Sequence, residues 1–168
     1  MIYLVDSNCF MDASRFHYPF DIAESFWKKL SEAANNHLFY SIDKVHDEIF
    51  ENEDALSNWC SDNLPEDFFI STNTTQIWTQ YGKLVNWATE KIQKGLKESG
   101  LKKFINETKA DIFFVALASL DPDKYTVVTD EISAVSSKKD IKLPDACSAF
   151  NIRSINFIEM LRELQIKF

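Results

Sequence analysis

The sequence has few of the residues that build disulfide scaffolds, zinc sites or long flexible linkers. It contains three cysteines and three histidines, and no two cysteines form a CxxC pair. Cys9, Cys60 and Cys147 make no zinc-binding pattern with the histidines. Their odd number and wide spacing predict reduced thiols in a cytoplasmic protein. Only three glycines and four prolines leave little room for linkers, so we expect one folded domain over residues 1–168.

The chain also lacks an apolar run long enough to cross a membrane, which needs about 18 residues. The apolar start of the sequence is interrupted by Asp6. It has neither the basic residues nor the long apolar stretch of a signal peptide. We therefore expect no association with a membrane.

An excess of positive charge is missing as well. The 18 Lys and Arg residues are outnumbered by 26 Asp and Glu residues, for a net charge of −8. Such a charge disfavours broad, non-specific binding to nucleic acid. The segment 83–109 differs from the rest, because it holds seven lysines and three glutamates. This segment is either a solvated helix face or a basic surface that guides a phosphate backbone.

Short apolar runs alternate with helical patterns along the whole sequence. We expect strands at 2–5, 38–40, 68–70, 125–128 and 152–155. We expect helices at 21–35, 41–49, 54–60, 74–92, 111–120 and 157–164, with a short one opening at Leu143. The expected caps are Asp21 with Glu24, Ser41, and Thr74 or Thr75. This alternation predicts an α/β fold, a three-layer α/β/α sandwich around a central, mostly parallel sheet.

Carboxylates stand at the places where such a sheet binds ligands. Asp6 follows the first expected strand, and Asp130 and Glu131 follow the fourth. Ligands of open α/β sheets bind outside the carboxyl ends of the strands. Asp111 opens an otherwise apolar helix, and Glu48 lies on a helix face that is expected to point inward. Carboxylates beside buried positions are costly unless they are paired or bound to a metal.

The same acids have ordinary explanations when each is taken alone. Asp6 and Asp111 could cap helices, Glu48 could be a surface residue, and Asp130 and Glu131 could be turn residues. The set as a whole points to a cation. Hard oxygen ligands without His or Cys favour Mg²⁺ or Mn²⁺ over Zn²⁺.

Four short motifs in this order resemble the PIN domain superfamily. They are VDSN at 5–8, VHDEI at 45–49, KADIFFVALA at 109–118 and VVTDE at 127–131. The resemblance extends to YPFD at 18–21, KLPDAC at 142–147 and the tail INFIEMLRELQIKF at 155–168. These further segments are similar to a PIN-like subgroup of small prokaryotic proteins formerly of unknown function, which is toxin-like and VapC-related.

The resemblance implies a role for each acid and for three of their neighbours. The implied metal ligands for Mg²⁺ or Mn²⁺ are Asp6, Glu48, Asp111 and Glu131. Asp130 stands between Thr129 and Glu131, and either carboxylate could reach the site. Asn8 and Thr129 would orient carboxylates or water. Asp145 is either a further acid near the site or the cap of its own helix.

The function implied by the resemblance is that of a metal-dependent endoribonuclease that hydrolyses RNA phosphodiester bonds. The VapC-related subgroup further implies the toxin of a type II toxin–antitoxin pair, with a cognate antitoxin as partner and a possible homodimer. The alternative is a non-catalytic PIN-like module that binds RNA or protein. A haloacid-dehalogenase-like phosphatase is disfavoured, because it needs a second Asp where this sequence has Asn8.

Overall fold

The computed structural model describes all 168 residues and has a five-stranded parallel sheet at its centre. The strands are β1 (Ile2–Val5), β2 (Phe39–Ile42), β3 (Phe69–Ile70), β4 (Tyr125–Val128) and β5 (Arg153–Ile155). Their order in the sheet is β3-β2-β1-β4-β5, and every pair of neighbours is parallel. Each of the five strands expected from the sequence is present.

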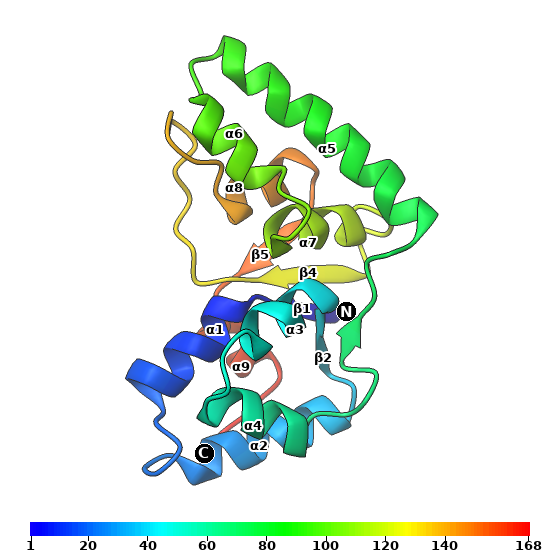
Figure 1. Cartoon of the computed structure of the whole chain (residues 1–168). Helices are drawn as coiled ribbons and strands as arrows, with labels where there is room; N and C mark the ends of the chain where they lie inside the picture. The colour runs from blue at the N-terminus through cyan, green and yellow to red at the C-terminus, as the bar shows by residue number, and fades with distance from the viewer.

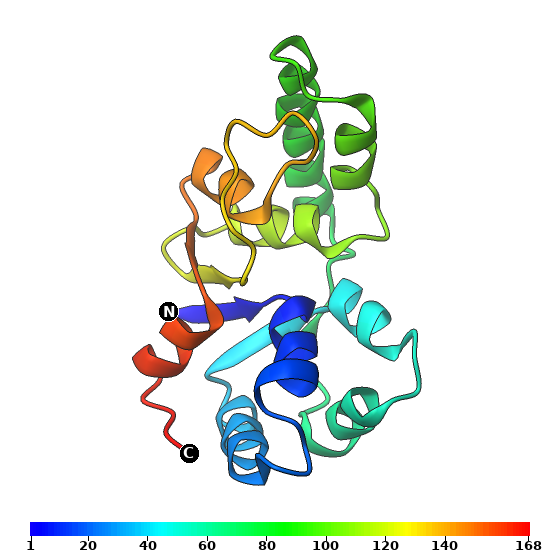
Figure 2. The ribbon, with the colours of Figure 1, turned by 90° about the vertical axis from the view of Figure 1, so that its left-hand side faces the viewer.

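Helices cover both faces of the sheet, so the expected three-layer α/β/α sandwich is confirmed. They are α1 (Ser7–Asp12), the π-helix η1 (Ala13–His17), α2 (Glu24–Asn35), α3 (Asp43–Phe50), α4 (Ala55–Asn63), α5 (Thr75–Gln93), α6 (Glu98–Phe104), α7 (Ala110–Ala118), α8 (Leu143–Ala149) and α9 (Phe157–Glu163). In Figure 1, α5 to α8 lie on one side of the sheet, whereas α1, α2, α4 and α9 lie on the other. Figure 2 shows the loop after β4 rising beside α8 toward the end of α5.

The strand order changes direction between β1 and β4. From β1 the sheet extends through β2 to β3 on one side, and β4 and β5 are added on the other. Val5 pairs with Val128, and the amide of Asp6 donates to the carbonyl oxygen of Val128 at 2.9 Å. The residues that follow β1 and β4 therefore leave the sheet side by side. Such a switch point is where open α/β sheets form their binding crevice.

The hydrophobic core is one cluster of 41 buried residues that reaches both faces of the sheet. Helix α7 is buried on all sides, as its apolar sequence predicted, because it packs against the sheet as well as against α5. Six phenylalanines are fully buried: Phe10, Phe26, Phe39, Phe68, Phe113 and Phe114. Cys9, Cys60 and Cys147 are buried and free. None of the helices is long and apolar enough to span a bilayer.

Two of the helix caps expected from the sequence are wrong. Helix α2 begins at Glu24 after Ala23, and the side chain of Asp21 makes no capping hydrogen bond. Ser41 belongs to β2, where its hydroxyl donates to the carbonyl oxygen of Val5 at 2.7 Å. A buried serine in a strand satisfies its hydroxyl by reaching the neighbouring strand, and this competes with capping. Thr74 does cap α5, since it accepts a hydrogen bond from the amide of Ile77.

Three short helical segments were not among the helices placed from the sequence, although a helix capped by Asp6 had been considered. Helix α1 and η1 follow β1 directly, and α6 lies between Gly95 and the loop before α7. Gly100 is buried inside α6, and this helix packs against α5.

Candidate metal centre

A pocket of about 450 Å³ lies at the switch point, where β1 and β4 end. The residues that line it are Asp6, Ser7, Asn8, Met11, Arg15, Glu48, Glu51, Asn52, Lys103, Lys109, Asp111 and Glu131. They come from α1, η1, α3, α6, α7 and the turn after β4. All four acids that the resemblance implied as metal ligands are among them. We call this the carboxylate pocket.

Asp6 is the most buried of these acids, with 3% of its surface exposed. It occupies the N-cap position of α1, but its side chain makes no capping hydrogen bond. Its carboxylate instead accepts a hydrogen bond from the hydroxyl of Thr129 at 3.0 Å and a longer one from the amide of Asn8 at 3.4 Å. Thr129 and Asn8 therefore hold this carboxylate in the pocket.

Asp111 lies in the first turn of α7 and does not cap that helix. The N-cap residue is Lys109, and no side-chain cap is made there. The carboxylate of Asp111 faces the pocket without a hydrogen bond or an ion pair to any protein group. A carboxylate near the core with no direct partner is costly, which is the condition that favours a bound cation.

The two aspartates have pKa values far above those of ordinary carboxyl groups. Burial raises the pKa of Asp6 from 3.8 to about 7, and the negative charge of Asp111 adds to this. Burial also raises the pKa of Asp111, to about 6, together with the charges of Glu131 and Glu48. The same low-dielectric surroundings that disfavour these charges would strengthen their attraction for a cation.

Glu48 is held at the opposite side of the pocket by α3. One carboxylate oxygen accepts a hydrogen bond from the hydroxyl of Ser7 at 2.7 Å, and the other lies 4.0 Å from the ammonium of Lys109. The Ser7 hydroxyl also lies 3.4 Å from Asp6. Ser7 therefore links the two acids, one from each side of the pocket.

Glu131 and Asp130 point to different parts of the molecule. Glu131 lines the carboxylate pocket, where its carboxylate accepts from the amide of Leu143 at 3.1 Å and lies 3.7 Å from the ammonium of Lys142. Asp130 lies outside the pocket and accepts from the amide of Phe157 at the start of α9 at 3.0 Å. Of the two acids that the sequence left open, the structure brings only Glu131 to the other three.

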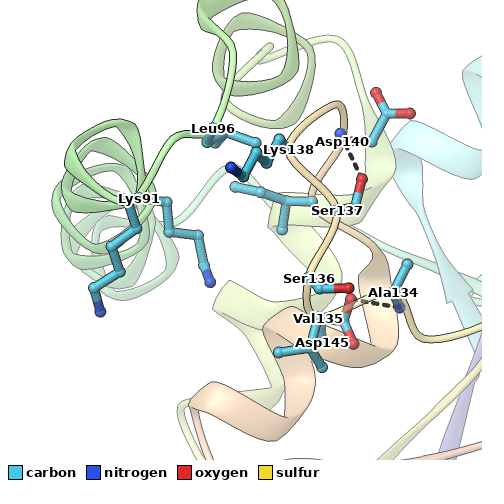
Figure 3. A pocket seen from close by; sticks show the side chains of 11 residues that line it. Lys91, Leu96, Ala134, Val135, Ser136, Ser137, Lys138, Asp140 and Asp145 are labelled. Atoms are coloured by element: carbon cyan, nitrogen blue, oxygen red, sulfur yellow. Dashed lines mark hydrogen bonds between the residues drawn. The ribbon is translucent and has the colours of Figure 1, made fainter.

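Asp145 lies outside the carboxylate pocket as well. It accepts hydrogen bonds from the hydroxyl of Ser133 and from the amide of Ala134 at 2.9 Å. Figure 3 shows the second of these bonds, next to a separate hollow. Asp145 does not cap α8 either, because that helix has Lys142 at its N-cap position. Its visible role is to hold the loop after β4 against α8.

The fit of the pocket to a divalent cation depends on movement of the two glutamates. As the side chains lie, no group of three Asp, Glu, His or Cys residues is gathered closely enough to hold an ion. Glu48 and Glu131 each have a hydrogen-bond donor and a lysine beside them, whereas Asp111 has neither in direct contact. The donor set consists of oxygens, which suits Mg²⁺ or Mn²⁺. The donor types therefore fit such an ion, whereas the side chains as they lie do not yet surround one.

Several residues of the pocket were not identified from the sequence. Ser7 could have been identified from the sequence, because it lies in the VDSN motif directly after Asp6. Arg15, Lys103 and Lys109 also line the pocket, and Arg15 forms no ion pair. These basic side chains reach the pocket from η1, from α6 and from the residue before α7. Their placement depends on how distant segments pack, which no local pattern reveals.

Comparisons with known proteins give a family and a fold. A family model described as "Domain of unknown function (DUF4411)" matches residues 3–168. The search of curated proteins found no match. Among solved structures, the chain is similar to the crystal structure of VapBC2 from Rickettsia felis bound to a DNA fragment from their promoter. That likeness has a TM-score of 0.51 and 19% sequence identity, and it covers 94% of this chain and 99% of the other. At this identity the likeness shows the fold alone.

Proposed function

The chain belongs to the DUF4411 family, and we propose that it is a metal-dependent endoribonuclease that hydrolyses RNA phosphodiester bonds. One observation carries the proposal. Asp6 and Asp111, with raised pKa values, meet at the switch point of the sheet without an ion-pair partner for either. Two buried carboxyl groups without a cationic partner lower the stability of the fold. Carboxyl groups with strongly shifted pKa values in a pocket are typical of functional sites.

We propose that Asp6, Glu48, Asp111 and Glu131 hold Mg²⁺ or Mn²⁺. A bound divalent cation supplies a Lewis acid and makes bound water more acidic. Thr129 and Asn8 keep the Asp6 carboxylate aimed into the pocket, and the Ser7 hydroxyl lies within reach of both Glu48 and Asp6. The pKa of Asp6, about 7, means that this carboxyl group carries a proton for much of the time at neutral pH before an ion binds.

Cationic side chains of the same pocket suit an anionic substrate. Arg15, Lys103 and Lys109 line the pocket, and Arg15 has no carboxylate partner. A guanidinium can bind two oxygens of one phosphate, whereas lysines act as point charges. We propose that Arg15 contacts the phosphate that is cut, while the two lysines balance its charge.

We further propose that the protein is the toxin of a type II toxin–antitoxin pair. Two findings support this finer proposal: the sequence resemblance to VapC-related proteins, and the likeness in fold to VapBC2 along nearly the whole chain. The partner would be a cognate antitoxin protein. Co-expression with the product of the adjacent gene, followed by purification through a tag on one protein, tests the pair. Growth arrest without the partner, and its relief with the partner, is the expected result.

One observation favours the alternative, a non-catalytic module that binds RNA or protein. Glu48 and Glu131 already have partners inside the protein, which suits a pocket that works without a metal. The two functions differ in their response to Mn²⁺. A module that only binds RNA would do so equally well with and without the ion.

The experiment is a cleavage assay on single-stranded RNA with Mn²⁺ or with a chelator. Wild type is compared with Asp6→Asn and Asp111→Asn, and Asp21→Asn serves as the control because Asp21 is exposed and makes no side-chain hydrogen bond. We expect cleavage to require Mn²⁺ and to fall on the order of 10²–10³-fold in the two pocket variants. Equal cleavage by all four proteins would show that the activity arises elsewhere or from a contaminant.

A further inference from the structure

A second hollow, of about 440 Å³, lies near the carboxylate pocket and has more lysines than acids in its lining. It lies between the end of α5 and the loop that follows β4 (Figure 3). Lys91, Lys94 and Lys138 line it, together with Ser136, Ser137 and two acids, Asp140 and Asp145. Asp145 is hydrogen-bonded to Ser133 and Ala134, and Asp140 forms an ion pair with Lys103. We call this hollow the lysine cleft.

The positive charge around the lysine cleft comes from two segments that are distant in the sequence. Residues 91–109 and 138–142 together contain nine lysines and three acids, in a protein of net charge −8. The loop packs directly on the start of α6, where the amide of Lys97 donates to the carbonyl oxygen of Lys138 at 2.8 Å. Gly100 permits this approach, because a Cβ there would collide with the carbonyl of Lys139. The basic surface is therefore built by the fold.

Most lysines around the cleft have no acidic partner. Lys94, Lys97, Lys138 and Lys139 form no ion pair, and Lys91 lies 4.6 Å from the centre of the Trp87 ring. The ion pairs of the two segments lie outside this group, on Lys102, Lys103, Lys109 and Lys142. Unneutralised ammonium groups concentrated on one surface attract a polyanion.

One ion pair joins the lining of the lysine cleft to that of the carboxylate pocket. Lys103 lines the pocket, Asp140 lines the cleft, and their side chains form an ion pair at 3.6 Å. A chain of phosphates with one phosphate in the carboxylate pocket would meet the cleft lysines next. An acidic peptide could also bind the lysines, but nothing in its chemistry requires the neighbouring pocket.

We propose that the lysine cleft binds the backbone of single-stranded RNA beside the bond that is cut, an inference that rests on the proposed function. Lys94 and Lys138 contact phosphates as point charges, with Lys91 at the edge of the cleft. The Ser137 oxygen accepts from the amides of Lys139 and Asp140, which leaves its hydroxyl proton free to donate to a phosphate.

The test measures binding without cleavage. A labelled oligouridylate of about 12 nucleotides, a length within the range that single-strand binders cover, is titrated by fluorescence anisotropy in a chelator at several salt concentrations. The cleft variant combines Lys91→Gln, Lys94→Gln and Lys138→Gln. The matched control combines Lys28→Gln, Lys124→Gln and Lys167→Gln, three exposed lysines on other surfaces. Thermal melts establish that both are folded.

We expect the cleft variant to bind the RNA roughly tenfold more weakly than wild type at low salt. The slope of log affinity against log salt concentration should be smaller by about 2, which corresponds to three phosphate contacts on a single strand. The control variant should keep the wild-type slope. Equal losses in both variants, or no loss in either, would overturn the proposal. So would a cleft variant that binds RNA normally but loses an acidic hexaglutamate peptide, because the cleft would then be a protein-binding site.

This outcome is separable from that of the nuclease proposal. If no protein cuts RNA but the cleft variant alone loses RNA affinity, the cleft assignment stands and the nuclease proposal fails. If cleavage occurs, the cleft variant should show a higher KM for the long oligonucleotide and an unchanged kcat. A trinucleotide, too short to reach the cleft, should be cut equally by the cleft variant and wild type.

Discussion

Two groups of carboxylates in this protein are treated in opposite ways by their surroundings. On the outside, Glu163 accepts from the hydroxyl of Tyr3 at 2.7 Å and forms a two-bond ion pair with Arg153. The hydrogen bond from Arg153 lowers the pKa of Glu163 to about 2. In the carboxylate pocket, burial instead raises the pKa values of Asp6 and Asp111 to about 7 and about 6.

The difference shows what each group contributes. Glu163 has its cation inside the protein, so its negative charge is favourable in the folded state. Asp6 and Asp111 lie against other acids, and the lysines nearby do not form ion pairs with them. A carboxylate whose cationic partner belongs to the protein has a structural role. Buried carboxylates without such a partner lower the stability of the fold unless a cation binds from outside.

The largest expected effect separates Glu131 from Asp130. Glu131→Gln keeps the shape of the side chain but removes a charge from the pocket, so RNA cleavage with Mn²⁺ should fall by about 10²-fold. Asp130→Asn keeps an oxygen that can accept from the amide of Phe157, so cleavage should stay close to wild type. Steady-state rates on one RNA substrate compare the two. An equal loss of cleavage in both variants would mean that Glu131 and Asp130 contribute equally to activity.

This distinction was available from the sequence, although it was not drawn there. In extended backbone, alternate side chains point to opposite sides. Thr129 follows β4, and its hydroxyl reaches both Asp6 and the amide of Glu131. Asp130 therefore faces the other way, toward α9. The presence of the five strands and their parallel direction followed from the short apolar runs, and parallel strands place Asp6 and the Asp130–Glu131 pair at the same edge of the sheet.

Other parts of the site could not have been read from local patterns. Lys103 reaches the pocket because α6 forms, and α6 is a short helix that was not among those expected from the sequence. The lysine cleft needs the contact between residues 97 and 138, which are far apart in the chain. Asp21 failed as a cap because α2 starts after Ala23 and not at the position that its motif indicated. Packing decides such features, and packing is set by the whole fold.

The second expected effect is stabilisation by the proposed divalent cation. In a thermal melt near pH 7.5, Mn²⁺ at about 100 times its Kd should raise Tm by about 5–10 °C, by mass action on a domain of this size. The gain should shrink near pH 5, because protons on Asp6 and Asp111 compete with the ion. Asp111→Asn should lose most of the gain, whereas Glu163→Gln should keep it. A wild-type melt that ignores Mn²⁺ would contradict the metal assignment.

The third effect concerns the protein without metal. The folded pKa of Asp111 lies above its ordinary value, so the folded state binds its proton more tightly than the unfolded chain does. This favours folding at low pH, and the advantage is lost as pH rises from about 4 through about 6. In a chelator, Asp111→Asn should therefore be more stable than wild type at pH 8, by on the order of 1–2 kcal/mol, and the difference should vanish near pH 4.

Urea unfolding at these two pH values measures the third effect, with Asp21→Asn as the control. A variant that is less stable than wild type at pH 8 would show that Asp111 is satisfied inside the protein. Asp111 would then stabilise the fold as Glu163 does, and the proposed difference between the two acids would be wrong.

The smallest effect is expected from the exposed pair itself. Glu163→Gln keeps an acceptor for Tyr3 but loses the charge opposite Arg153, so Tm at neutral pH should fall slightly. The folded pKa of Glu163 is lowered, so its contribution is present above about pH 4.5 and is lost as pH falls toward 2. Salt should screen most of it, because both side chains are exposed to solvent. Thermal melts of Glu163→Gln and wild type in low and high salt test this. If the stability lost in Glu163→Gln were as large as the stability gained in Asp111→Asn, solvent exposure would not distinguish the two kinds of acid.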